Sequence, residues 1–147
     1  GELPKESPFF YLMETARNLC LVLEKKADLG REIRLAYSQE DKETLQEIAN
    51  IKIPVLLQRL QDFYQSFRTQ WNLENKSFGF EVQTVRIGGL LQRLKDVQEI
   101  LNAYLREEIS GIAELNEPQK AFHYFEQNEI RSLNYNLWTD IVSPSKI

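Results

Sequence analysis

Apolar residues recur at steps of three and four along most of the chain, and this spacing constrains the fold more than any other feature of the sequence. The recurrence forms three long rows: Phe9, Met13, Ala16, Cys20, Leu23 and Ala27; then Leu45, Ile48, Ile53, Leu56, Leu60, Phe63, Phe67 and Trp71; then Ile87, Leu91, Leu94, Val97, Leu101, Leu105 and Ile109. Each row lies on one face of an α-helix. Long helices joined by short connections pack best antiparallel. The sequence therefore predicts an all-α fold, an antiparallel bundle of three to five long helices.

Residues that favour helix starts and stops place the expected boundaries. Ser7 predicts the cap of the first helix. Gly30 either ends this helix or lies inside one longer helix, because the apolar pattern continues beyond it. Ser38, followed by Asp41, predicts the cap of the second helix. Pro54 lies within the second row, where it removes a hydrogen bond, so we expect a kink or two abutting helices there.

The last thirty residues have weak helical periodicity, and "NYNLWTDIV" alternates bulky residues in a manner that suits an extended segment. We expect residues 117–147 to form an extended tail packed on the bundle, and residues 1–147 to form a single helical domain. The chain is too short for a (β/α)8 barrel, which needs roughly 250 residues. This length is consistent with a fragment of a larger protein.

Composition and charge argue against several classes of protein. The formal net charge is −4 and no basic block occurs, so we expect no nucleic-acid partner. No apolar run approaches the roughly 20 residues of a membrane helix, and no export signal is visible, so we expect no membrane partner. A cytoplasmic location is the default that remains.

Few residues in the chain have the chemistry of a catalytic or metal site. Cys20 is the only cysteine, which excludes an internal disulfide and a cysteine-based cluster, and its place in the first row predicts a small buried hydrophobe. His123 is the only histidine and cannot make a zinc site alone. Glu107-Glu108 and Glu40-Asp41 resemble solvated helix faces. We expect no catalytic residue, no metal and no cofactor.

The stretch "WNLENKSFGFEVQTVRIGG" interrupts this regular pattern between the second and third rows. We expect a turn from Asn75 to Gly79, where Gly79 can adopt the positive φ that other residues resist. Gly88 and Gly89 would each cost about 1 kcal/mol relative to alanine inside a helix, so we expect another group to approach the backbone closely there. Residues 67–93 thus form a helix-turn-helix unit, here named the hairpin corner.

Charged and aromatic side chains of the hairpin corner allow two interpretations. They hold the tip together as a buried network, in which Glu81 pairs with an arginine, or they form a docking face with the residue types of interface hot spots, such as Trp71, Phe78 and Phe80. Aromatic residues at helical spacing favour the first interpretation. The candidate residues are Arg68, Trp71, Asn75, Lys76, Gly79, Phe80, Glu81, Arg86, Gly88, Gly89 and Arg93.

These residues also carry a resemblance to a known family. The pattern Phe67-Arg68, Trp71, Asn75-Lys76, Gly79-Phe80-Glu81-Val82, Arg86, Gly88-Gly89-Leu90 and Arg93 resembles the C-terminal helical region of bacterial family 20 glycoside hydrolases, the exo-acting β-N-acetylhexosaminidases. A looser resemblance extends over "KADLGREIRLAY" and "YNLWTDIV". In such enzymes an adjacent Asp and Glu of a preceding (β/α)8 barrel work with the 2-acetamido group of the substrate. The resemblance transfers no catalytic residue to this chain.

The resemblance implies an accessory domain that packs on the catalytic barrel of the same polypeptide. Such a domain could also support a homodimer or the rim of the active site. The main alternative is a free-standing helical module that binds a protein partner through the hairpin corner. Direct sugar binding by Trp71 or Trp138 is a third hypothesis, because aromatic faces stack on sugar rings.

Overall fold

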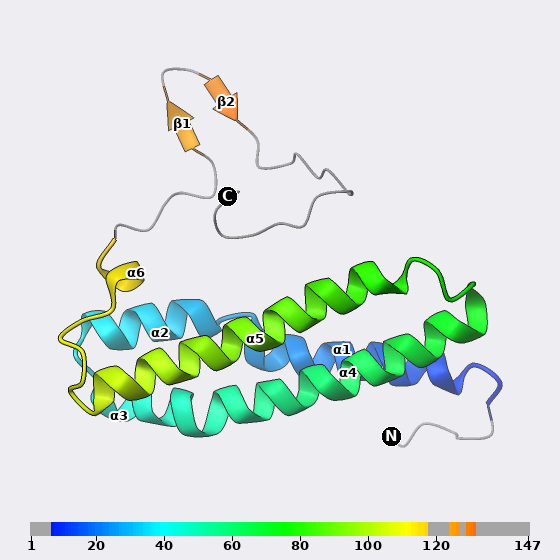
Figure 1. The fold of residues 1–147 in the computed structure, drawn as a ribbon, viewed down its shortest axis with the longest axis horizontal. Coiled ribbons are helices and arrows are strands. Elements are labelled where there is room, and N and C mark those ends of the chain that lie inside the picture. The colour runs from blue at the N-terminus through cyan, green and yellow to red at the C-terminus, as the bar shows by residue number, and fades with distance from the viewer. Residues whose placement is uncertain (1–6, 118–123, 127–128, 132–147) are drawn as a thin grey trace. The chain divides into compact units, whose positions relative to one another are not determined.

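The computed structural model describes residues 7–117, 124–126 and 129–131. The chain forms two compact units, Gly1–Ile112 and Ala113–Ile147, which are described separately. The first unit contains, in chain order, α1 (Phe10–Lys26), α2 (Leu29–Ser38), α3 (Lys42–Glu47), the π-helical turn η1 (Ile48–Lys52), α4 (Ile53–Glu74) and α5 (Phe80–Leu105) (Figure 1). Helix α4 packs against α1 and α5. The predicted all-α bundle is confirmed.

The core of this unit is built mainly on the second apolar row. Its largest fully buried side chains are Leu45, Ile48, Ile53, Leu56 and Leu101. The third row contributes Leu101 and Leu94, which is 6% exposed. Both rows therefore face the interior, as their spacing predicts.

The first apolar row, in contrast, does not face the interior, and this prediction is wrong. Phe9, Met13 and Leu23 are 60%, 45% and 49% exposed, and Cys20 is exposed rather than buried. A different face of α1 packs on α4. This face buries Thr15 and Val22 and hydrogen-bonds to α4. The orientation of α1 therefore depends on polar side chains, which a pattern of apolar residues does not include.

The seam between α1 and α4 is joined by hydrogen bonds along its length. The Tyr11 hydroxyl donates to Glu74 Oε1 (3.2 Å), Asn18 Nδ2 donates to Ser66 Oγ (3.1 Å), and Arg59 Nη1 donates to the Leu21 carbonyl (2.7 Å). The partners rise along α1 while they fall along α4. The two helices are therefore antiparallel.

Two expected boundaries of the first helix differ in the structure. Ser7 Oγ accepts from the Phe9 N–H (3.3 Å), and α1 begins one residue after that. The chain breaks between Lys26 and Leu29, so Gly30 lies inside α2. Gly30 therefore neither ends the first helix nor lies inside one longer helix, because the break comes before it.

Asp41, rather than Ser38, caps the helix that follows. Asp41 accepts from the Thr44 N–H (3.0 Å) and from the Thr44 hydroxyl (2.6 Å), whereas Ser38 Oγ donates to the Leu35 carbonyl of its own helix. The hydrogen bond from the Thr44 side chain, with that from its backbone, holds the pKa of Asp41 below its ordinary value. This is the pattern of an ionised N-cap carboxylate.

The expected irregularity at Pro54 takes the form of the π-helical turn η1. The Ile53 N–H donates to the Ile48 carbonyl, five residues back instead of four. In this pattern the Ala49 carbonyl would next accept from residue 54, but proline has no N–H. Gln98 Nε2 of α5 donates to the Ala49 carbonyl instead (2.7 Å). A side chain of α5 thus satisfies the carbonyl that Pro54 leaves without a backbone donor.

Replacing Gln98 by methionine should therefore lower the free energy of unfolding by about 1–3 kcal/mol, because it leaves a buried carbonyl without a donor. Ala49 is fully buried, so water cannot replace the lost bond. Chemical denaturation of both proteins measures the difference. Gln92→Met is the control, since Gln92 is exposed and bonds only within α5 to Asp96. Equal losses in the two variants would contradict this role for Gln98.

The second unit contains α6 (Ala113–Asn116) and a short antiparallel pair, β1 (Tyr124–Glu126) and β2 (Glu129–Arg131), with Phe125 opposite Ile130. An extended conformation thus occurs within residues 117–147. The segment "NYNLWTDIV", with Trp138, lies outside the described residues, and so does His123. The packing of the tail on the bundle stays a prediction.

Candidate docking surface

A tight five-residue turn joins α4 to α5 at the tip of the hairpin corner. Asn75 is extended (φ −130°, ψ 167°), and its N–H donates to the Trp71 carbonyl (2.8 Å). Gly79 has a φ of +97°, in the left-handed region where other residues are strained. Glu81 Oε2 accepts from the Gly79 N–H (2.7 Å). The backbone of the turn is thus fixed by its own hydrogen bonds.

The Trp71 indole is part of this turn. Its Nε1 donates to the Lys76 carbonyl (2.9 Å), and a Cβ added at Gly79 would lie 3.3 Å from Trp71 Cζ2. Glycine at position 79 therefore provides both the positive φ and the space that the indole occupies. The Trp71 side chain thus packs against the turn and hydrogen-bonds to its backbone.

Aromatic rings behind the turn join the two helices. Phe80 is 7% exposed, and its ring centroid lies 5.5 Å from that of Phe67, 5.6 Å from that of Tyr64 and 5.7 Å from that of Trp71. Phe63 stacks on Phe67 at 5.6 Å. The rings meet at the separations that favour aromatic pairs. Trp71 and Phe80 therefore hold the tip together, as the first interpretation of the corner expects.

A different set of residues in the corner faces outward. The side chains of Phe78, Val82 and Val85 are 86%, 41% and 53% exposed. Gly88 and Gly89 continue this face about one turn beyond Val85, and a Cβ added at either would meet no described atom within 4 Å. The close approach expected at these glycines is therefore not made by any part of the chain that the structure describes. These five residues are named the outer face of α5.

The charged and polar candidates of the corner differ in exposure. Arg68, Asn75 and Lys76 are exposed, whereas Arg86 and Arg93 are half-buried on α5. The hydrogen bond described for Glu81 goes to the turn backbone, so its pairing with an arginine stays a prediction. The corner is also tied to α1, because Tyr11 donates to Glu74 there. Partial burial, followed by this bond to the Glu74 carboxylate, raises the pKa of Tyr11.

One comparison with known proteins bears on this corner. The family model of the glycoside hydrolase 20C C-terminal domain matches residues 3–134, which include the whole bundle and the hairpin corner. The chain belongs to this family. No curated protein matches the chain. The resemblance of the corner to family 20 glycoside hydrolases is thereby confirmed.

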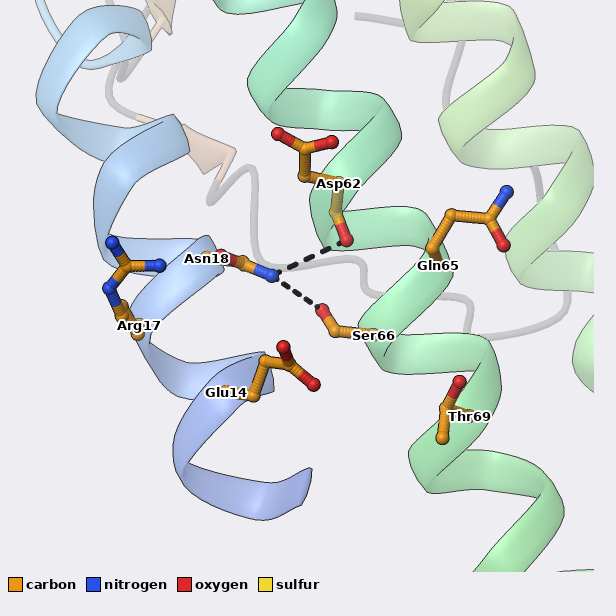
Figure 2. Close-up of a pocket in the computed structure, with 7 residues that line it drawn as sticks. All are labelled: Glu14, Arg17, Asn18, Asp62, Gln65, Ser66 and Thr69. Atoms are coloured by element: carbon orange, nitrogen blue, oxygen red, sulfur yellow. Dashed lines mark hydrogen bonds between the residues drawn. The ribbon is translucent and has the colours of Figure 1, made fainter. Parts of the chain in front are cut away.

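This glycoside hydrolase 20C domain also has a polar groove between α1 and α4. The groove has a volume of about 380 Å³, and its lining residues are Glu14, Arg17, Asn18, Asp62, Gln65, Ser66 and Thr69. Figure 2 shows Asn18 reaching across it to the Asp62 carbonyl and to Ser66. The periodicity of apolar residues gave no signal for this groove. Its open, hydrogen-bonded floor belongs to the helix seam described above.

Two kinds of feature are absent from the described part of this glycoside hydrolase domain. Within residues 7–117, 124–126 and 129–131, no group of three or more His, Cys, Asp and Glu side chains is arranged to hold a metal ion. No helix within those ranges is both long and apolar enough to cross a bilayer. Exposed apolar side chains, among them those of the outer face of α5, do occur in the same part of the chain. Sequence reasoning missed Val82 and Val85, which spacing alone could not distinguish from core residues.

Proposed function

We propose that this chain is the non-catalytic C-terminal helical domain of a β-N-acetylhexosaminidase, and that it packs on the catalytic (β/α)8 barrel of the same polypeptide. Hydrolysis belongs to the barrel. The domain supports the barrel through the outer face of α5. The family assignment supports the first part of this proposal, and the geometry of α5 supports the second.

The glycine pair in α5 is the observation that carries the proposal. Gly88 and Gly89 lie inside a helix that runs unbroken from Phe80 to Leu105, where each glycine costs about 1 kcal/mol relative to alanine. Neither has a positive φ, and neither has a neighbour that a Cβ would displace. Within residues 7–117, 124–126 and 129–131, no packing or backbone requirement thus calls for either glycine. A partner whose backbone approaches α5 closely at this point would explain both glycines.

The neighbours of the glycines have the composition of an interface. Phe78 extends from a turn whose backbone is fixed by a hydrogen bond, so little backbone freedom is lost when its ring is bound. Val82 and Val85 add apolar surface beside the glycines. Such a patch, with an aromatic anchor, is what a permanent interdomain contact requires. We place any contribution to a homodimer or to the active-site rim at this same corner.

Isothermal titration calorimetry of this chain into the separately expressed barrel tests the proposal. We expect saturable binding with a negative heat-capacity change, because apolar surface becomes buried. The absence of binding, with a barrel that is folded and active, would overturn the proposal and favour a free-standing interaction module.

Substitution of the glycines makes this test specific to α5. The double variant Gly88→Ala, Gly89→Ala should be more stable than the parent chain by about 2 kcal/mol, from about 1 kcal/mol at each position. It should nevertheless bind the barrel at least about tenfold more weakly, because two methyl groups separate the backbones. Gly30→Ala is the matched control: Gly30 is exposed inside α2 with no neighbour within 4 Å, so it should gain stability and bind normally.

A further inference from the structure

The exposed face of α1 is a second apolar surface, separate from the outer face of α5. It consists of Phe9, Met13, Ala16, Cys20, Leu23 and Ala27, all of which are exposed. This set is named the α1 stripe. It extends from residue 9 to residue 27, and these 18 steps correspond to about 27 Å of helix. None of its members belongs to the core, so the folding of the described bundle does not explain them.

The spacing within the α1 stripe indicates what shape of partner fits it. Successive members are separated by 4, 3, 4, 3 and 4 residues, which is the heptad spacing of a coiled-coil seam. A seam of this kind is narrow and follows the contact with a single helix, whereas a helix that faces a broad core carries a wider apolar face. The α1 stripe therefore matches one helix that crosses α1 at a shallow angle.

The size and charge of the residues support this geometry. Ala16, Cys20 and Ala27 are small and allow a helix to approach closely, while Phe9 and Leu23 provide large apolar side chains. On one side the seam is flanked by Arg17 and Glu24, and Glu24 pairs with Arg59 of α4 (2.9 Å). On the other side it is flanked by Leu19, which is 40% exposed, and by Lys26. Charged residues in these flanking positions select the partner and its orientation in helix pairs.

The source of that helix follows from the place of the domain in its family. The matched family is a C-terminal domain, and its match starts at residue 3, six residues before Phe9. Six residues span at most about 20 Å, which limits how far from the first residue of the α1 stripe the preceding polypeptide joins the matched region. The outer layer of a (β/α)8 barrel consists of helices. The tether thus holds a layer of candidate helices close to α1.

We propose that the α1 stripe binds one outer helix of the catalytic barrel in a coiled-coil-like pair. This inference rests on the proposed function and adds a second, separately located contact to it. The helix that binds carries its own apolar heptad positions toward Cys20 and buries the thiol. The α1 stripe, which the sequence predicts to be buried, is then buried in the whole enzyme although it is exposed in this domain.

Cys20 provides a direct reporter at the centre of the stripe. The full-length enzyme and the 147-residue chain are treated with N-ethylmaleimide, and the tryptic peptide 18–25 is followed by mass spectrometry. We expect Cys20 to react about tenfold or more slowly in the full-length enzyme, because a covered thiol reacts only while the interface is open. Equal rates would overturn the proposal, and so would slow reaction in the 147-residue chain, which would mean that the chain covers its own stripe.

Two further measurements identify the partner. Leu23→Glu in the full-length enzyme should restore the fast rate, whereas Leu35→Glu, a position of similar exposure on α2 (51% against 49%), should not. Protection of Cys20 that disappears on dilution would show a second copy of the chain in the seam and would overturn the proposal. If the isolated barrel binds this chain while Cys20 stays reactive, the proposed contact at the α1 stripe is wrong and the proposed function stands. If nothing binds, both fail.

Discussion

Replacing Phe80 by alanine is expected to lower the free energy of unfolding of this chain by about 3–5 kcal/mol. Phe80 is 7% exposed and lies within 6 Å of three other aromatic rings, at centroid distances of 5.5, 5.6 and 5.7 Å. Its removal leaves a cavity where α5 packs on the aromatic end of α4. Urea denaturation followed by far-UV circular dichroism measures the loss.

Phe78 provides the matched control two residues earlier. It is 86% exposed, so Phe78→Ala should change the free energy of unfolding of this chain by no more than about 0.5 kcal/mol. The same variant should weaken association with the barrel, which Phe80→Ala would affect only through unfolding. A large loss of stability from Phe78→Ala would show that its ring is packed and would remove it from the outer face of α5.

The contrast between these two phenylalanines shows what the sequence could predict about the corner. Helical spacing places Trp71, Phe67 and Phe63 on one face of α4, and in the structure their rings contact one another in sequence along that face. Phe78 lies in the turn, where no helical period applies, so its exposure depends on the φ of Gly79 and could not be read from spacing. Periodicity therefore predicted the interior of the corner and not its surface.

Helix α1 shows a second limit of the same reasoning. Its heptad stripe is the most regular apolar pattern of the helix, yet α1 packs on α4 through Thr15, Asn18 and Val22. The seam between these helices is stabilised by hydrogen bonds and small side chains, which a search for apolar residues does not weigh. A regular stripe indicates that a face will be buried, but not that the partner is in the same domain.

The π-helical turn, in contrast, has a signal in the sequence that is easily overlooked. The second apolar row steps by five residues from Ile48 to Ile53, whereas its other steps near the turn are of three or four. An α-helix would place Ile53 well off the face that holds Ile48, but one extra residue in a π-turn restores the alignment. Pro54 alone predicted an irregularity. The five-residue step together with Pro54 specifies which one.

Deleting Asn50 is therefore expected to be more damaging than any change of its side chain. Asn50 is exposed within η1, so the deletion removes no buried group. It removes the extra residue of the turn, and a regular helix then rotates α3 by about 100° relative to α4. Leu45 and Ile48, which are fully buried, would leave the core, or the helix would have to break.

The proline raises the cost of the regular helix further. With no π-turn before it, Pro54 lies in a helix interior, where the lost hydrogen bond and the clash with a preceding carbonyl cost about 3 kcal/mol or more. A domain of this kind has a total stability of about 5–15 kcal/mol, so we expect the deletion to lower the midpoint of chemical denaturation strongly. Asn50→Ala is the control, and its free energy of unfolding should stay within about 0.5 kcal/mol of that of the parent chain. If the deletion variant were as stable as Asn50→Ala, the alignment of the α3 and α4 faces would not depend on the extra residue. The Ala49 carbonyl is left without a backbone donor only because the π-turn precedes Pro54. If the π-turn were dispensable, the hydrogen bond from Gln98 to that carbonyl would be an incidental contact.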